Sequence, residues 1–291
     1  MLEEEEALRG YSLILLAAFF WGTSGTAQTF APESATPASV GAIRIGLGGA
    51  VLCLSALVRG KLPPGENWPY GKTVLAGVTM AAYQLFFFTA VSLTGVAVAT
   101  VVTMGSSPIM AGLLSWLMDR KKPSASWYAA TTAAIVGCVL LLLPEAETVV
   151  EPAGILLSLG GGFVYALYAL FSKKVLATRS AETLLGLAGL TGGLVLLPVL
   201  LINNPLWLLD TRGGLQVGLY LGFISMALPY LLFNLGLVMV PVANAMTLTL
   251  AEPVTAALLG IFLVGEELTP LNYAGLFLIL VGISLITVQR E

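Results

Sequence analysis

The chain is divided almost entirely into long apolar segments, and this division points to a fold that crosses a lipid bilayer many times. Charged residues, prolines and glycines separate ten such segments. A transmembrane helix needs about 20 apolar residues, at 1.5 Å each, to cross a hydrocarbon layer roughly 30 Å thick. We therefore predict ten transmembrane helices, at residues 11–30, 37–58, 71–92, 96–118, 126–144, 152–176, 181–203, 214–237, 241–264 and 270–288.

The composition excludes the other architectures. Hydrophobic residues make up 57% of the chain and charged residues 10%, whereas a soluble domain carries about 25% charged residues. A transmembrane β-barrel would alternate polar and apolar residues in segments of about ten, but the apolar runs here are unbroken. The predicted class is an all-α polytopic membrane protein embedded in the lipid bilayer.

The positions of lysine and arginine predict the orientation. With the N-terminus in the cytoplasm, all of these residues except Arg44 and Arg212 fall on cytoplasmic segments, as the positive-inside rule requires. Residues 1–6 are mostly acidic where a signal peptide would be basic, so we expect the first apolar segment to be retained as a span. The sequence thus predicts a multi-pass protein with both termini in the cytoplasm.

Histidine is absent from the chain, which removes the commonest metal ligand and the commonest catalytic base. The sequence offers no nucleophile–base pair and no metal-ligand cluster in its place. We expect the protein not to be an enzyme, and we expect no metal, no other cofactor and no nucleic-acid partner.

The second half of the sequence repeats the first. Pro108 and Pro253 are 145 residues apart, and Tyr128 and Tyr273 are separated by the same offset. Other matches at offsets of 144 or 145 are Phe19 with Phe163, Gly48-Gly49 with Gly192-Gly193, Phe88 with Phe233, and Val136-Gly137 with Val281-Gly282. Each half holds five spans, an odd number, so the second copy must be inverted. We predict two inverted five-helix repeats, residues 1–146 and 147–291, around a central cavity, an architecture typical of transporters that work by alternating access.

Several polar and aromatic residues lie at membrane depth, where they must face the bundle interior or bond to a neighbouring helix. Trp21, Ser24 and Gln28 share one face of the first span. At the offset of 144, the corresponding positions of the sixth span hold Tyr165, Tyr168 and Ser172. The remaining candidates for a substrate site are Tyr83 and Gln84 on the third span, Asn234 on the eighth, and Asn244 and Thr249 on the ninth.

The ninth span carries a carboxylate, Glu252, followed directly by Pro253. A charge at this depth costs about 2.5–3.5 kcal/mol or more, and a proline removes one backbone hydrogen bond from a helix. Glu252 could bind a substrate amine, pair with Arg44, take up a proton, or brace the helix break. We predict that Pro108 and Pro253 are hinges for gating. Ser107 stands where the second copy has Glu252, so any role of the carboxylate belongs to one half.

Residues 228–234, 251–260 and 263–270 resemble the second half of the drug/metabolite transporter superfamily, and Trp21-Gly22 with the region of Arg44 resembles its first half. The chain is most similar to the ten-helix EamA-type exporters, and among them to the YddG-type amino-acid exporters. This resemblance implies a five-plus-five inverted bundle in a bacterial inner membrane that exports small metabolites.

Together these patterns predict a secondary transporter that exports hydrophobic or aromatic amino acids without coupling to an ion. The aromatic candidates would enclose the substrate side chain, and Gln84, Asn234, Asn244 and Thr249 would bond its polar end. An efflux transporter for other solutes, such as drug-like cations with proton coupling through Glu252, is the alternative. A channel is a further alternative. The sequence leaves the oligomeric state open.

Overall fold

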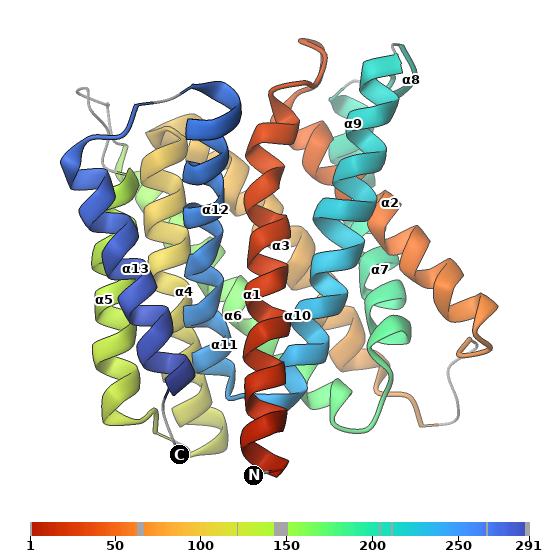
Figure 1. Ribbon diagram of the computed structural model, residues 1–291. Helices are drawn as coiled ribbons and strands as arrows, with labels where there is room; N and C mark the ends of the chain where they lie inside the picture. Colours follow the sequence, from red (N-terminus) through yellow and green to blue (C-terminus); the bar gives the residue numbers. More distant parts are fainter. Residues whose placement is uncertain are drawn as a thin grey trace.

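The computed structural model describes residues 2–62, 67–120, 122–142, 151–203, 205–210, 212–265 and 267–288, and the regular structure within these residues is entirely helical (Figure 1). Nine of the described helical segments are long and apolar enough to cross a membrane. A tenth long helix, α1 (Leu2–Gln28), extends over the height of the same bundle. The predicted all-α polytopic fold is confirmed.

The helices follow one another with short connections. The first half contains α1, α2 (Pro37–Val58), α3 (Tyr70–Thr94), α4 (Val96–Asp119) and α5 (Ala125–Leu142). The second half contains α6 (Pro152–Leu176), α7 (Ala181–Ile202), the short α8 (Trp207–Asp210), α9 (Arg212–Gly222), α10 (Leu228–Met239), α11 (Val242–Leu248), α12 (Glu252–Leu259) and α13 (Pro270–Val288). The predicted repeat boundary between residues 146 and 147 lies outside the described residues.

Most span boundaries agree with the prediction to within two residues, and α2, α6 and α13 match it at both ends. The main difference is α1, which begins at Leu2 instead of residue 11. Its first turns are rich in Glu, Ala and Leu, which are good helix formers. Hydropathy marks where a helix enters the bilayer, so it does not detect a helix that continues beyond the membrane.

Two pairs of helices meet with almost no loop, and a residue with a restricted or unusual backbone conformation ends the first helix of each pair. Gly95, between α3 and α4, has a φ of +80°, a conformation that side chains other than glycine rarely adopt. Between α10 and α11, Val240 is extended and Pro241 follows it, as expected for a residue before proline. The predicted division at both places is confirmed.

The irregular helical turns that the structure describes all lie in the second half. A π-helical turn at Phe223–Ala227 joins α9 to α10, and a second at Gly260–Val264 follows α12. A 3₁₀ turn at Thr249–Ala251 separates α11 from α12. Pro253 lies in the first turn of α12, directly after this break, whereas α4 remains α-helical through Pro108. The two matching prolines therefore have different local effects.

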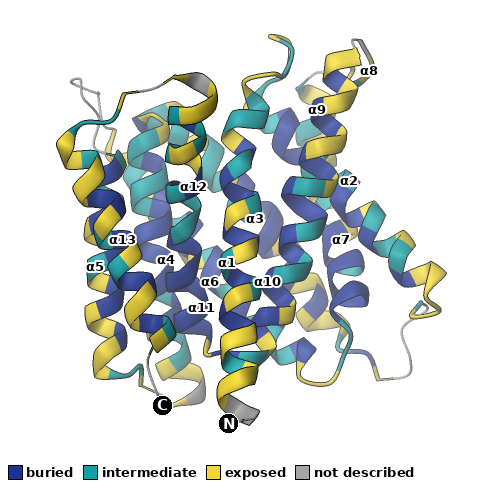
Figure 2. Cartoon of the chain, in the orientation of Figure 1, coloured by how far each residue is buried: buried dark blue, intermediate teal, exposed yellow. Residues whose placement is uncertain are grey.

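The packing of the helices has the pseudo-twofold symmetry of an inverted repeat. The three most extensive contacts are those of α3 with α6, α5 with α13 and α2 with α7, and the last two join equivalent helices of the two halves. The contact of α3 with α6 has its counterpart in that of α10 with α1. Both ends of the chain lie at one end of the bundle (Figure 1), and the buried residues line its interior (Figure 2).

Glycines allow the equivalent helices to approach closely. A Cβ atom added at Gly49 on α2 would lie 2.5 Å from the carbonyl carbon of Gly189 on α7. On the other pair, a Cβ at Gly137 on α5 would lie 2.6 Å from the carbonyl oxygen of Gly275 on α13. Gly189 and Gly193 form a GxxxG motif on α7 that packs against Gly49 and Gly46 of α2, as such motifs do between membrane helices.

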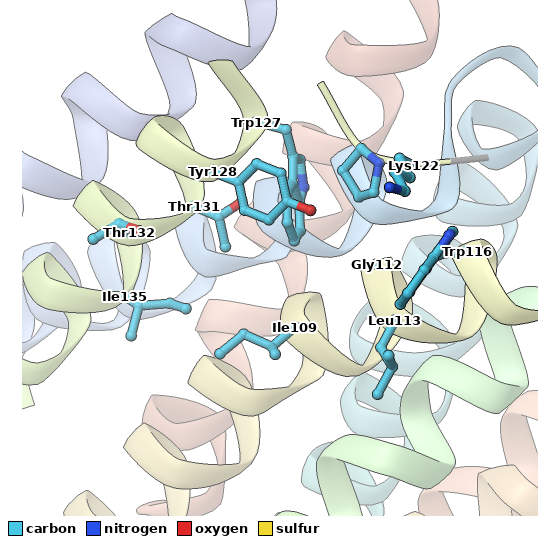
Figure 3. A pocket seen from close by; sticks show the side chains of 11 residues that line it. Ile109, Gly112, Leu113, Trp116, Lys122, Trp127, Tyr128, Thr131, Thr132 and Ile135 are labelled. Atoms are coloured by element: carbon cyan, nitrogen blue, oxygen red, sulfur yellow. The ribbon is translucent and has the colours of Figure 1, made fainter. Parts of the chain in front are cut away.

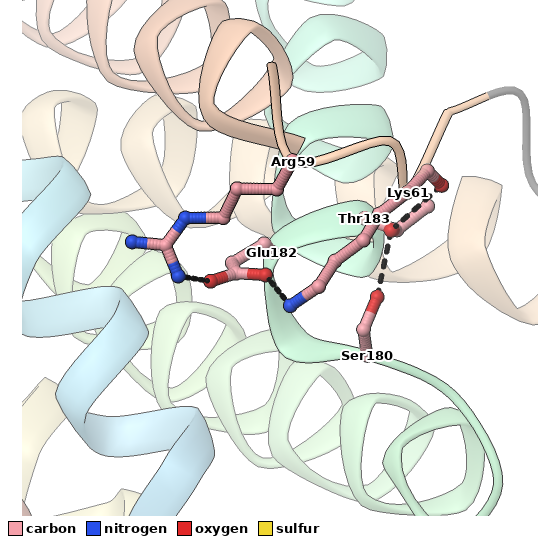
Figure 4. Close-up of polar contacts among 5 residues, drawn as sticks. All are labelled: Arg59, Lys61, Ser180, Glu182 and Thr183. Atoms are coloured by element: carbon pink, nitrogen blue, oxygen red, sulfur yellow. Dashed lines mark hydrogen bonds and ion pairs between the residues drawn. The ribbon is translucent and has the colours of Figure 1, made fainter. Parts of the chain in front are cut away.

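A charged cluster connects the two halves at the end of the bundle that carries the termini (Figure 4). Glu182, at the start of α7, accepts a hydrogen bond from Arg59 Nη1 at 2.7 Å and another from Lys61 Nζ. Its side chain is 11% exposed, while those of Arg59 and Lys61 are 62% and 41% exposed. Thr183 adds a bond of 3.3 Å to the carbonyl of Lys61. The carboxylate is the buried member, so its loss should matter more than the loss of either cation.

We expect Glu182→Gln to lower the free energy of unfolding by about 1 kcal/mol, because it leaves the two cations side by side without a counter-charge. The effect is limited to this size because solvent screens the exposed cations. The midpoint of thermal unfolding in detergent would measure this loss. Glu5→Gln, an exposed position on α1, is the matched control and should leave the midpoint unchanged. Equal midpoints for the two variants would contradict a stabilising role for the cluster.

Candidate functional site

Aromatic side chains from four helices meet in the middle of the bundle. Trp21 on α1 lies 6.4 Å from Tyr165 on α6 and 5.2 Å from Tyr230 on α10, measured between ring centroids. Tyr83 on α3 is 5.4 Å from Tyr165, and Tyr168 is 5.5 Å from Tyr230. The four aromatic candidates predicted from the sequence are therefore neighbours. Their rings meet edge-on or tilted, the arrangement that aromatic pairs prefer.

A polar group lies beside the aromatic cluster, where α1 and α2 meet the π-helical turn at Phe223–Ala227. The hydroxyls of Ser24 and Ser225 share a hydrogen bond. Arg44 Nη2 donates to the carbonyl oxygen of Ser225, in the π-helical turn before α10, at 2.9 Å, and Arg44 Nε is buried without a partner. Gln28 donates to the carbonyl of Ser24 within its own helix, at 3.3 Å. Arg44 thus reaches into the bundle rather than towards the membrane surface.

The predicted amides are buried on different helices. Asn234 Nδ2 donates to the Tyr168 hydroxyl at 2.6 Å, and Asn234 Oδ1 is buried without a partner. Asn244 Nδ2 donates to the Tyr11 hydroxyl at 3.3 Å. Gln84 is buried, with its Oε1 atom against Gly41 of α2. Asn234 therefore belongs to the aromatic cluster, while Asn244 lies nearer the end with the chain termini.

The hydroxyl of Thr249 is less available for binding a substrate than the sequence predicted. It is buried, and its hydroxyl donates to the carbonyl of Met246 at 2.7 Å, within its own helix. A neighbouring threonine makes the bond between helices instead, because Thr247 and Thr131 on α5 share a hydrogen bond of 2.8 Å. This bond ties α11 to α5.

Glu252 is the first residue of α12 and follows the 3₁₀ turn. Within the described residues its carboxylate makes no hydrogen bond and no ion pair, and its side chain is half-buried. The tight fit of α1 fixes its backbone, since a Cβ at Gly22 would lie 2.6 Å from the Glu252 carbonyl oxygen. Arg44 attracts the carboxylate from a distance, without forming an ion pair with it. Two groups of opposite charge therefore lie in the same interior, and neither forms an ion pair with a described residue.

Both charges act on the aromatic cluster. Tyr83 and Tyr230 each lie within electrostatic reach of Glu252 and of Arg44. Charges separated by a low-dielectric interior interact much more strongly than they would in water. The site can therefore offer an anionic contact, a cationic contact and ring faces to one small molecule.

A cavity of about 800 Å³ opens at the end of the bundle that carries the termini. Lys122, Lys173 and Asn244 line it. Lys173 Nζ donates to the carbonyl of Val240 in the turn between α10 and α11. Among the described residues that line this cavity there is no Asp or Glu, so its electrostatic potential favours anionic groups.

Comparison with known proteins decides the family. A model of the EamA-like transporter family matches this chain twice, over residues 8–143 and 152–288. The chain belongs to the EamA-like transporter family. It is therefore a transporter, and not an enzyme, and the two matches are its two repeats.

The alignments of this EamA-like protein with two curated relatives cover nearly the whole length of both proteins. The chain is 43% identical to the uncharacterized transporter YwfM of Bacillus subtilis, covering 95% of this chain and 93% of that protein. It is 27% identical to the threonine/homoserine exporter RhtA of Escherichia coli K12, covering 96% and 92%. A crystal structure of a protein at 19% identity gives a TM-score of 0.82 over 95% of both chains, which supports the EamA-like fold.

Sequence reasoning missed several residues of this EamA-like site. Ser225 and Tyr11 carry no signal in the sequence, because a lone hydroxyl in an apolar helix is common and its partner depends on how the helices are rotated. In the sequence, Lys122 and Lys173 of the lysine-lined cavity predicted only the orientation. Their convergence on one cavity follows from the positions of the helix ends, which the sequence does not give.

Proposed function

We propose that the protein exports amino acids with hydrophobic or aromatic side chains through the central site by alternating access. The observation that carries this proposal is a carboxylate, Glu252, and a guanidinium, Arg44, that form no ion pair with any described residue and lie beside a cluster of aromatic rings. A zwitterionic amino acid would bring an ammonium group to the carboxylate and a carboxylate to the guanidinium, which forms strong charge-assisted hydrogen bonds.

The candidate residues divide into two groups around such a substrate. Trp21, Tyr83, Tyr165 and Tyr168 would surround its side chain with ring surface. The buried and unpartnered Asn234 Oδ1 would accept a hydrogen bond from its ammonium group. The other polar candidates would line the substrate path on either side of the central site; they are Ser24, Gln28, Gln84, Asn244 and Thr249. Ligand sites of this kind combine mostly apolar walls with few polar groups.

The proposed orientation decides which end of the substrate path opens to the cytoplasm. We place the end of the bundle that carries both termini in the cytoplasm of a bacterial inner membrane, because the basic residues gather there. The lysine-lined cavity then opens to the cytoplasm and would attract the carboxylate of an amino acid. Bending at Pro253, beside the break in its span, and at Pro108 would open and close the gates. We propose that a monomer is sufficient.

We propose that transport is uncoupled. The chain has no histidine, and Glu252 is the one carboxylate at membrane depth in the described spans, so a chain of proton acceptors is not available.

Uptake of radiolabelled amino acids into proteoliposomes tests the substrate and the coupling together. We expect exchange of hydrophobic or aromatic amino acids, at the same rate with and without a pH gradient. The panel should include threonine and homoserine, which the name of RhtA gives as the substrates of that relative. Absence of transport for every amino acid would exclude the proposed substrate class, and a rate that rises with the proton gradient would exclude uncoupled transport.

A drug-like cation is the second candidate substrate, and the unpartnered carboxylate of Glu252 favours it. The basic cavity disfavours it, because Lys122 and Lys173 would repel a cation approaching from the cytoplasm. Adding a quaternary ammonium dye to the same panel separates the two candidates.

A further inference from the structure

A groove of about 540 Å³ lies between α4 and α5, on the outer surface of the bundle. Figure 3 shows its two ends: Lys122, Trp127 and the Tyr128 hydroxyl gather at one, and Ile109 and Ile135 lie at the other. The polar end coincides with the connection between the two helices, at the end of the bundle that carries the termini. The groove is therefore polar where the membrane meets water and apolar at membrane depth.

The polar end of the groove contains a hydrogen-bond donor that has no acceptor among the described residues. Trp127 is 4% exposed, and its indole Nε1 has no partner, whereas the indoles of Trp68 and Trp207 bond to Thr73 and Ser39. A buried donor without an acceptor costs about 1–3 kcal/mol. An acceptor supplied by a bound molecule would remove this cost at the indole N–H of Trp127.

A cation accompanies this donor. Lys122 is exposed, its Nζ lies 5.4 Å from the centroid of the Trp116 ring, and no carboxylate pairs with it among the described residues. Trp116 is itself 40% exposed on the outer surface of the bundle. The ammonium group is therefore held beside the mouth of the groove with its charge uncompensated.

The equivalent place in the second repeat is built differently. At the offset of 145, Glu267 stands for Lys122 and Asn272 stands for Trp127. The Asn272 amide is satisfied, since Nδ2 donates to the carbonyl of Leu141 at 2.9 Å and Oδ1 accepts from the Thr269 backbone at 2.9 Å. The unsatisfied donor and the cation are thus specific to the groove of the first repeat and do not follow from the fold itself.

We propose that this groove binds an anionic glycerophospholipid from the membrane leaflet at the end of the bundle that carries the termini. An acyl chain lies along the apolar part, between Ile109 and Ile135, and the phosphate accepts the Trp127 N–H. Lys122 supplies the charge that distinguishes an anionic headgroup from a zwitterionic one. Basic pockets between transmembrane helices are a recognised way of binding anionic lipid headgroups.

The site has a direct connection to the interior of the transporter. Thr131, which lines the groove, shares its hydroxyl hydrogen bond with Thr247 on α11. Lipid in the groove therefore contacts the same turn of α5 that holds α11 in place.

Lipid binding to the purified full-length protein, measured by native mass spectrometry, tests the proposal. The probes are phosphatidylglycerol and phosphatidylcholine with identical oleoyl chains, and monoolein, which has no phosphate. The wild type should bind phosphatidylglycerol about fivefold more tightly than phosphatidylcholine, the effect of one lysine near the membrane surface. Lys122→Gln should remove this preference. Lys72→Gln, which removes an exposed charge from the same end of the bundle, should keep it.

Trp127→Phe separates the donor from the charge. It should weaken both phospholipids about threefold to tenfold, the effect of one hydrogen bond, and leave the preference between them and the binding of monoolein unchanged. Comparing three lipids on one variant removes any general loss of stability from the result. The proposal is overturned by a wild type that does not prefer phosphatidylglycerol, by a Lys122→Gln variant that keeps the preference, or by a Trp127→Phe variant that binds all three lipids like the wild type.

Discussion

Glu252→Gln should lower the rate of amino-acid transport about a hundredfold at substrate concentrations well below KM, because it removes the proposed partner of the substrate ammonium group from a buried site. The substitution keeps the shape of the side chain and its ability to form hydrogen bonds. Initial rates of exchange in proteoliposomes, measured over a range of substrate concentrations, would give the change in kcat/KM.

Two comparisons make this expectation specific. Glu33→Gln changes an exposed carboxylate and should transport at the wild-type rate. Arg44→Gln should reduce transport of the free amino acid but spare that of its amide, which has no carboxylate for the guanidinium to bind. Glu252→Gln at the wild-type rate would exclude a role for the carboxylate in binding the substrate, whatever the identity of that substrate.

Gly49→Ala should destabilise the protein by about 3 kcal/mol, the upper part of the range for overpacking a close-packed interior. The added methyl group would lie 2.5 Å from the carbonyl carbon of Gly189, and neither backbone can move without separating α2 from α7. Gly46→Ala is the matched control on the same helix, since nothing lies within 4 Å of a Cβ there, and alanine has the higher helix propensity.

The yield of folded protein in detergent and the midpoint of thermal unfolding would measure both variants. We expect Gly46→Ala to equal or exceed the wild type, and Gly49→Ala to lose both yield and stability. Equal behaviour of the two variants would show that the contact between α2 and α7 tolerates separation. Contacts between chains play no part in this expectation, because Gly49 and Gly189 pack against each other within the bundle.

The sequence predicted the membrane-spanning helices well, because each span must satisfy its own backbone in lipid and therefore carries its own apolar run. The spacing of Trp21, Ser24 and Gln28 also predicted a face that points inward, and Trp21 indeed meets Tyr165. Helical periodicity contains this information, since residues three and four apart share a face.

The remaining features of the site depend on how the helices are packed against one another. The bond between Arg44 and the Ser225 carbonyl joins residues far apart in the sequence. The π-helical turn that carries Ser225 has no sequence signature comparable to a proline or a cap. The unsatisfied indole of Trp127 is likewise invisible in a sequence, because a tryptophan near the end of a span normally lies at the membrane interface. Only the packed structure distinguishes a buried donor from an exposed one.

The inverted arrangement of the repeats limits how similar their sequences can remain. Equivalent loops lie on opposite sides of the bilayer, so a chain that concentrates lysine and arginine on one side must place different charges in the two copies of a loop. Lys122 and Glu267 are such a pair. Mutations that made the two halves alike in their loops would weaken the signal that sets the direction of insertion. This constraint on charge does not act on uncharged positions inside the membrane, where Pro108 and Pro253 still match.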